Sequence, residues 1–196
     1  AAVGGLLGSK LLFLLEDPAL TLAQLGNPAY LIGGKTIVGG LLGGWIGVEL
    51  AKRAVGIARS TGDLLVPPLI VGLVVGRLGC LFAGAGDHTS GHLAAVPWAL
   101  DLGDGRRHPT QAYEIGFLGL CALLDRLPAR RDGDRFLRFI GAYLAFRVVV
   151  DFWKAPFGPD PVLPHPHRLP VGLTPIQAVS LLGACYAAGR LLRRSA

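Results

Sequence analysis

The fold of this chain is decided by Leu64–Ala85, LLVPPLIVGLVVGRLGCLFAGA, a stretch of 22 residues with a single charge at Arg77. A helix of about 20 apolar residues crosses the roughly 30 Å hydrocarbon layer of a membrane. Five further apolar stretches are spread over the rest of the chain. They are residues 1–15, 29–50, 112–127, 136–153 and 173–192. The pattern predicts an all-α fold, a polytopic bundle of about six transmembrane helices.

The composition supports this class of protein. Of 196 residues, 52% are hydrophobic, 16% are charged and 29 are glycine, and the mean hydropathy is +0.51. Soluble domains carry about 25% charged residues and about 7% glycine. A soluble chain of this size has too little interior for so much apolar surface, and disorder requires low hydrophobicity. We therefore expect one integral membrane domain over residues 1–196.

The charged residues are distributed unevenly between the loops. Basic residues gather in Ala51–Thr61, in Pro128–Arg135 and in the C-terminal tail. Such an excess marks the cytoplasmic side of a membrane protein, so six spans place both ends of the chain in the cytoplasm. It also accounts for the net charge of +6 without a nucleic-acid partner. The predicted external loops are about 16–28, 86–111 and 155–172.

Glycines recur at four-residue spacing within two of the apolar stretches. Small residues at this spacing let helix backbones approach closely in a membrane. We therefore predict close helix packing at two sets of glycines. They are Gly39, Gly40, Gly43, Gly44 and Gly47 in one stretch, and Gly72, Gly76 and Gly79 in the next.

Arg77 lies about two-thirds along its apolar stretch, with no acid at helical spacing on the same stretch. A charge within a membrane is costly and usually functional. The planar guanidinium suits a phosphate, so an anionic ligand is one interpretation. The alternative is a structural ion pair with Glu49, Glu114 or Asp151.

Arg147 and Asp151 are four residues apart, which places them on one face of a helix. A self-neutralising pair and a functional role are both open for Asp151. Arg147 lies deeper in the apolar stretch, which favours a functional role for it.

The segment His108–Glu114, HPTQAYE, opens another apolar stretch. Pro109 suits the start of a helix, and an acid in the first turns suits the helix dipole. His108 would stand at the outer surface, where a histidine can act as a general base. Gln111, Tyr113 and Glu114 would lie just inside.

Neither a metal nor a cofactor is expected. Cys80, Cys121 and Cys185 have no paired spacing, which argues against a zinc site or a disulfide framework. The other histidines are loop residues without a third ligand spaced beside them. They are His88, His92, His165 and His167.

Several blocks occur in an order that resembles the prolipoprotein diacylglyceryl transferases, enzymes of the bacterial inner membrane. The blocks are Gly39–Gly44, Gly76–Cys80, Arg107–Glu114, Arg147–Asp151 and Leu173–Gln177. The resemblance runs from about Gly4 to Leu192. That family has seven spans. Since this sequence contains no methionine, we expect that a first span precedes it.

The resemblance implies transfer of the diacylglyceryl group of phosphatidylglycerol to the thiol of a lipobox cysteine in a precursor protein. The substrate supplies the nucleophile, so the enzyme needs a base and cations for the phosphate. Arg77 and Arg147 match the family's arginines, and Asp151 stands where the family usually has a glutamate. The catalytic set implied is Arg77, Arg147, His108 and Asp151. The lipid-binding set is Gly76, Gly79, Gln111, Tyr113 and Glu114.

The chain also departs from the family's pattern. Val38 replaces a histidine, and two asparagines and a glutamate are replaced by Cys80, Ala83 and Ala85. His108, His88 or Asp87 would then have to supply the base. A second hypothesis follows from these losses: a catalytically silent, phospholipid-binding subunit of a larger membrane complex with other membrane subunits.

Overall fold

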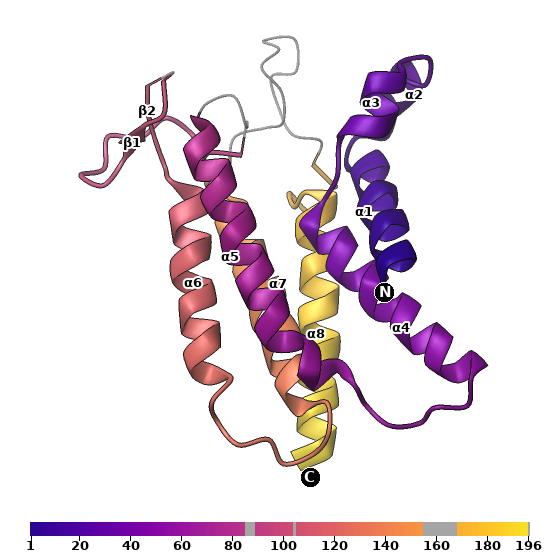
Figure 1. Ribbon diagram of the computed structural model, residues 1–196. Helices are drawn as coiled ribbons and strands as arrows, with labels where there is room; N and C mark the ends of the chain where they lie inside the picture. Colours follow the sequence, from indigo (N-terminus) through magenta and orange to yellow (C-terminus); the bar gives the residue numbers. More distant parts are fainter. Residues whose placement is uncertain (85–88, 104, 155–167, 196) are drawn as a thin grey trace. The chain divides into compact units, whose positions relative to one another are not determined.

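The computed structural model (Figure 1) describes residues 1–84, 89–103, 105–154 and 168–195, and these residues are mostly helical. The prediction of an all-α fold is confirmed at this level. The helices are α1 (Ala2–Glu16), α2 (Pro18–Ala23), α3 (Pro28–Gly33), α4 (Ile37–Ala54), the 3-10 helix η1 (Gly62–Leu65), α5 (Val66–Ala83), α6 (Thr110–Leu124), α7 (Asp134–Val150) and α8 (Pro175–Ser195). One short antiparallel hairpin, β1 (Leu100–Asp101) and β2 (Arg106–Arg107), precedes α6.

The chain forms two compact units. The first comprises Ala1–Arg59 and Pro166–Gly183, and the second comprises Ser60–His165 and Ala184–Ala196. The boundary falls within α8, whose two halves belong to different units.

In the first unit, α1 packs against α4 with the backbones in contact. A Cβ at Gly43 would overlap the carbonyl oxygen of Gly4 and would lie 2.8 Å from the Cα of Gly8. A Cβ at Gly39 would overlap the carbonyl oxygen of Gly8 in the same way. The four-residue spacing therefore places successive glycines at the contact, which confirms the predicted close packing for this stretch.

The predicted apolar stretch 29–50 is not one helix but two. Asn27 caps α3, accepting a hydrogen bond from the Ala29 amide at 3.1 Å, and Thr36 caps α4, accepting from the Gly39 amide at 3.3 Å. Thr36 is held in turn by Ser9 of α1, whose hydroxyl donates to the Thr36 carbonyl at 2.8 Å. Capping side chains satisfy amides that a helix start leaves free, so they place a new start at residue 37.

The break between α3 and α4 also provides hydrogen-bond acceptors for Lys10, a charged residue of α1. The ammonium group of Lys10 donates hydrogen bonds to the backbone carbonyls of Tyr30 at 3.3 Å and Gly34 at 3.1 Å. It also lies 4.9 Å from the centre of the Phe13 ring. Carbonyls left free at the end of α3 thus find a cationic partner.

The second unit is organised by α5, α6 and α7. Asp63 of η1 accepts hydrogen bonds from the amides of Gly133 at 2.7 Å and Phe136 at 2.9 Å. Gly133 has a φ of +93°, a conformation that glycine adopts at little cost. A carboxylate at the start of α7 is also favoured by the helix dipole. This contact fixes the beginning of α7 beside the beginning of α5.

Among the described residues, one helical segment, Gly62–Ala83, is long and apolar enough to cross a membrane, with a mean hydropathy of 2.1. It contains η1 and α5 and corresponds to the stretch that decided the fold class. Helix α6 is apolar but has 15 residues, and α7 has 17.

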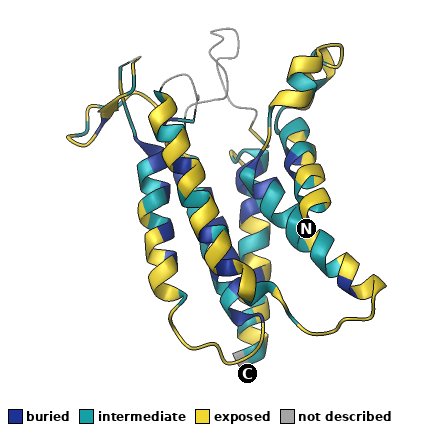
Figure 2. Cartoon of the chain, in the orientation of Figure 1, coloured by how far each residue is buried: buried dark blue, intermediate teal, exposed yellow. Residues whose placement is uncertain are grey.

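The predicted packing role of the α5 glycines is wrong for the described part of the chain. A Cβ at Gly72, Gly76 or Gly79 would meet nothing within 4 Å there. The buried residues of α5 include Ile70 and Arg77. At 100° per residue Gly72 and Gly79 fall on the opposite face, and Gly76 falls to one side of Arg77. Figure 2 shows α5 with an exposed and a buried side.

Gly43→Ala is expected to destabilise the protein by at least about 1–3 kcal/mol, because its methyl group would meet backbone atoms that cannot move independently. Gly72→Ala is the matched control, since its methyl group enters open space and alanine favours the helix. Thermal denaturation of the two variants in detergent checks this. Equal melting temperatures would show that the α1–α4 contact contributes little.

Candidate functional site

The carboxylate of Glu114 is the centre of a buried charge cluster in the second unit. It accepts a hydrogen bond from the hydroxyl of Tyr143 at 2.6 Å. One of its oxygens also lies 2.8 Å from Nε of Arg77 and 3.4 Å from Nη1 of Arg147. Glu114 is 1% exposed and Tyr143 is fully buried. Three helices, α5, α6 and α7, thus each place a charged side chain at one point.

Asp151 completes the cluster at the end of α7. Its Oδ1 lies 2.7 Å from Nη2 of Arg147, one helical turn away. The two carboxylates balance the charges of the two arginines, as a desolvated ion cluster requires. The predicted pairing of Arg147 with Asp151 is therefore present, and Arg77 pairs with Glu114, one of the three partners considered from the sequence.

The cluster does not use all of its hydrogen-bonding capacity. Nε of Arg147 is buried without a hydrogen-bond partner. The guanidinium of Arg77 directs Nη1 toward the sulfur of Cys80 at 3.9 Å, a weak acceptor. Each guanidinium carries five donors in a planar fork that matches a phosphate or carboxylate. Nε of Arg147 is therefore left as an unused donor.

His108, which directly precedes Pro109 and α6, lies beside two aromatic side chains. Its Nδ1 is 3.0 Å from the hydroxyl of Tyr113, which also accepts a hydrogen bond from the indole of Trp98 at 2.7 Å. The ring of Trp153 lies 6.4 Å from the imidazole. These contacts hold the imidazole in one orientation, which general base catalysis requires.

The start of α6 is tied to the segment 89–92. Thr110 donates a hydrogen bond from its hydroxyl to the Thr89 carbonyl at 2.8 Å. The amide group of Gln111 donates to the hydroxyl of Ser90 at 3.2 Å, whereas its oxygen is buried without a partner. Gly91 has no room for a side chain, because a Cβ there would lie 2.6 Å from Cβ of His108. The segment therefore closes tightly over His108 and Gln111.

Some of the predicted site residues do not contact the Glu114 cluster or the residues around His108 in the described part of the chain. Gly76 and Gly79 are exposed on α5, away from the buried side chain of Arg77. Asp87 and His88, named as possible bases, lie outside the described residues, as do His165 and His167.

Sequence reasoning missed two residues of the site. Tyr143 precedes Arg147 and Asp151 at four-residue spacing, and this repeat was the available signal. Lys154 follows the end of α7, where its backbone pairs with Gly91. Burial, together with the positive charge of Arg147, lowers the pKa of Lys154 to about 7. Its charge therefore changes near neutral pH.

The comparisons with known proteins bear on this site. A family model described as prolipoprotein diacylglyceryl transferase matches residues 1–192. The chain belongs to this family. The resemblance inferred from the sequence blocks is thereby confirmed.

Curated relatives carry the name phosphatidylglycerol–prolipoprotein diacylglyceryl transferase. The protein from Dehalococcoides mccartyi is 33% identical over 168 residues, which cover 78% of this chain and 62% of the relative. The protein from Bordetella parapertussis is 35% identical over 168 residues, covering 80% and 63%. That from Rhizobium leguminosarum bv. trifolii is 30% identical over 197 residues, covering 93% and 68%.

The chain thus spans just over three fifths of the length of the first two of these relatives. No solved structure matches it.

Glu114→Gln is expected to lower the stability of this family member by about 3–5 kcal/mol, because it leaves the buried charge of Arg77 without its carboxylate. Glu49→Gln is the control. It removes a half-exposed carboxylate 2.9 Å from Lys52, a pair worth about 0–1 kcal/mol. Melting temperatures in detergent compare the two. A Glu114→Gln variant as stable as Glu49→Gln would contradict the central role of this carboxylate.

Proposed function

We propose that this chain is a multi-pass protein of the bacterial inner membrane, with about six spans and a cytoplasmic C-terminus. Helix α5 meets the criteria for a span, and large apolar side chains are exposed on the helices. Phe82 is 84% exposed and Leu182 is 71% exposed. Large apolar side chains exposed in such number need lipid or another chain to cover them. The basic loops and the basic end of α8 support the orientation.

We further propose that it transfers the diacylglyceryl group of phosphatidylglycerol to the thiol of a lipobox cysteine in a precursor protein. The observation that carries this proposal is the convergence of Arg77 and Arg147 on Glu114. In the reaction, the thiol sulfur bonds to the glyceryl carbon that bears the phosphate. The carbon–oxygen bond to that phosphate breaks, glycerol phosphate leaves, and the thiol proton passes to a base.

The two guanidiniums are suited to the leaving group. Negative charge grows on the phosphate as the carbon–oxygen bond breaks, and preorganised cations stabilise that charge in a site without water. Glu114 and Asp151 orient the guanidiniums and balance them before lipid binds. Tyr143 holds Glu114 through the second carboxylate oxygen. The unused Nε donor of Arg147 remains for the lipid phosphate.

His108 is our proposed base for the thiol. It is held by Tyr113 and lies beside the segment 89–92, at the predicted outer surface, where a precursor protein would arrive. Gln111 has a buried oxygen without a partner, which suits a hydroxyl donor such as that of the lipid headgroup.

A second candidate function is a catalytically silent subunit that binds phospholipid within a larger membrane complex. Val38, which is buried and stands where the family usually has a histidine, favours it. The two functions share the lipid site and differ in whether a thiol is modified.

Arg77→Ala is expected to abolish lipid transfer, because the developing phosphate charge loses one of its two cations. The assay incubates the protein with phosphatidylglycerol and a lipobox peptide, and reads the mass increase of the peptide. Cys121→Ala is the control, since the substrate supplies the thiol. Transfer by Arg77→Ala at the wild-type rate would refute the role of Arg77. Lipid binding without transfer by the wild type would favour the silent subunit.

His108→Gln is expected to lower the transfer rate about 10²–10⁴-fold, the usual contribution of a general base. Gln retains polarity but does not take up a proton near neutral pH. Lys154→Met serves as the comparison, because the lowered pKa of Lys154, about 7, would also allow it to take up the thiol proton. If Lys154→Met shows the large loss and His108→Gln does not, the base is Lys154 and our assignment is wrong.

A further inference from the structure

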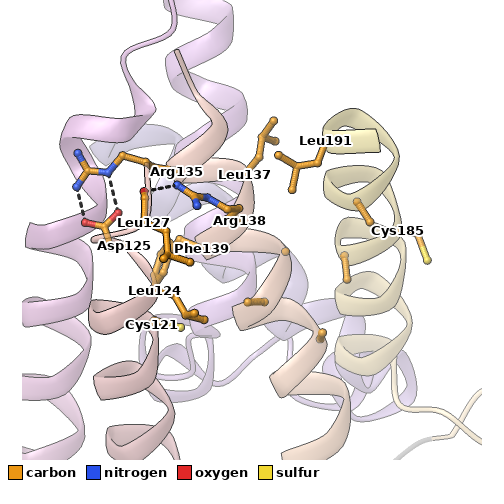
Figure 3. Close-up of a pocket in the computed structure, with 15 residues that line it drawn as sticks. Cys121, Leu124, Asp125, Leu127, Arg135, Leu137, Arg138, Phe139, Cys185 and Leu191 are labelled. Atoms are coloured by element: carbon orange, nitrogen blue, oxygen red, sulfur yellow. Dashed lines mark hydrogen bonds and ion pairs between the residues drawn. The ribbon is translucent and has the colours of Figure 1, made fainter. Parts of the chain in front are cut away.

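A second site lies at the basic end of the second unit, away from Glu114. It is a cavity of about 530 Å³ between α6, α7 and the C-terminal half of α8 (Figure 3). Ligand pockets usually enclose about 300–1,000 Å³. Small residues of α7 and α8 make the room: Ala142, Ala145, Ala184 and Ala188. The lining is otherwise mostly apolar.

Two arginines border the cavity, and their surroundings differ. Arg135 is paired with the carboxylate of Asp125, with Nε 2.8 Å from Oδ1. Arg138 donates one hydrogen bond to the backbone carbonyl of Leu127 at 3.0 Å, and no described carboxylate lies within ion-pair distance of it. Its other donors are left for a ligand. The cavity thus combines an apolar interior with a cation that pairs with no carboxylate of the described residues.

We propose that this cavity binds a phospholipid with an anionic headgroup, with an acyl chain among the apolar residues and the phosphate on Arg138. An acyl chain matches the lining, and a guanidinium matches a phosphate. The inference rests on the membrane placement proposed above, in which this end faces the anionic cytoplasmic leaflet. None of the cavity's lining residues belongs to the Glu114 cluster, so the two lipid sites are distinct.

The test uses the full chain in vesicles of phosphatidylglycerol that carries a diazirine on an acyl chain, with the corresponding phosphatidylcholine as comparison. After irradiation, mass spectrometry locates the labelled peptides. We expect labelling within residues 121–145 and 184–191 with phosphatidylglycerol, and about tenfold less with phosphatidylcholine, because its choline cation cancels the net negative charge that favours binding beside Arg138. Arg77→Ala is expected to leave this labelling intact.

Two variants and one control complete the test. Ala142→Phe fills the cavity and is expected to remove the labelling, whereas Arg138→Gln is expected to lower it to the phosphatidylcholine level. Arg130→Gln removes an exposed positive charge that does not line the cavity, and is expected to label as the wild type does. Each variant is first checked for an unchanged elution volume in detergent.

Equal labelling with both lipids, or unchanged labelling of Ala142→Phe, would overturn the proposal. So would cross-links to a second protein chain at these residues, because a protein would then occupy the cavity. Release of the wild type from vesicles by alkaline carbonate would contradict the membrane placement itself. If the protein stays in the membrane but these residues are not labelled, only the proposed lipid site in the cavity is overturned.

Discussion

The second unit depends on a single carboxylate, that of Glu114, which two guanidiniums and one hydroxyl share. Buried charges are costly to desolvate, and only close opposite charges and hydrogen bonds compensate for that cost. Helices α5, α6 and α7 must therefore keep the rotation and register that bring Arg77 and Arg147 to Glu114. The same requirement brings the two guanidiniums together at one carboxylate.

Helix α6 links two different environments in this unit. Its first turns carry Gln111 and Glu114, whereas Cys121 and Leu124 near its other end line the apolar cavity. Glu114 and Leu124 are separated by about 15 Å along the helix axis. A short helix thus connects the buried charge cluster with the apolar cavity at the basic end of the unit.

The two glycine repeats differ in the tertiary contacts that they make, although their spacing in the sequence is similar. The repeat at Gly39 and Gly43 lies against α1, whose backbone leaves no room for a Cβ. The repeat at Gly72 and Gly76 meets nothing within 4 Å among the described residues. The two repeats look alike because spacing reports only which residues share a face. Whether another helix covers that face depends on partners elsewhere in the chain.

The sequence by itself determined the helical class and the charge asymmetry of the loops. It also placed Arg147 and Asp151 on one helix face, because helical periodicity is local. It also identified Arg77, since a lone charge among apolar residues is costly wherever the helix packs. Only the tertiary structure decided that Glu114 is the partner of Arg77 and that Tyr143 donates a hydrogen bond to the same carboxylate. It also decided that residues 29–50 are divided between two helices. These features depend on the rotation and register of separate helices and on caps such as Ser9 with Thr36, which no pattern within one helix contains.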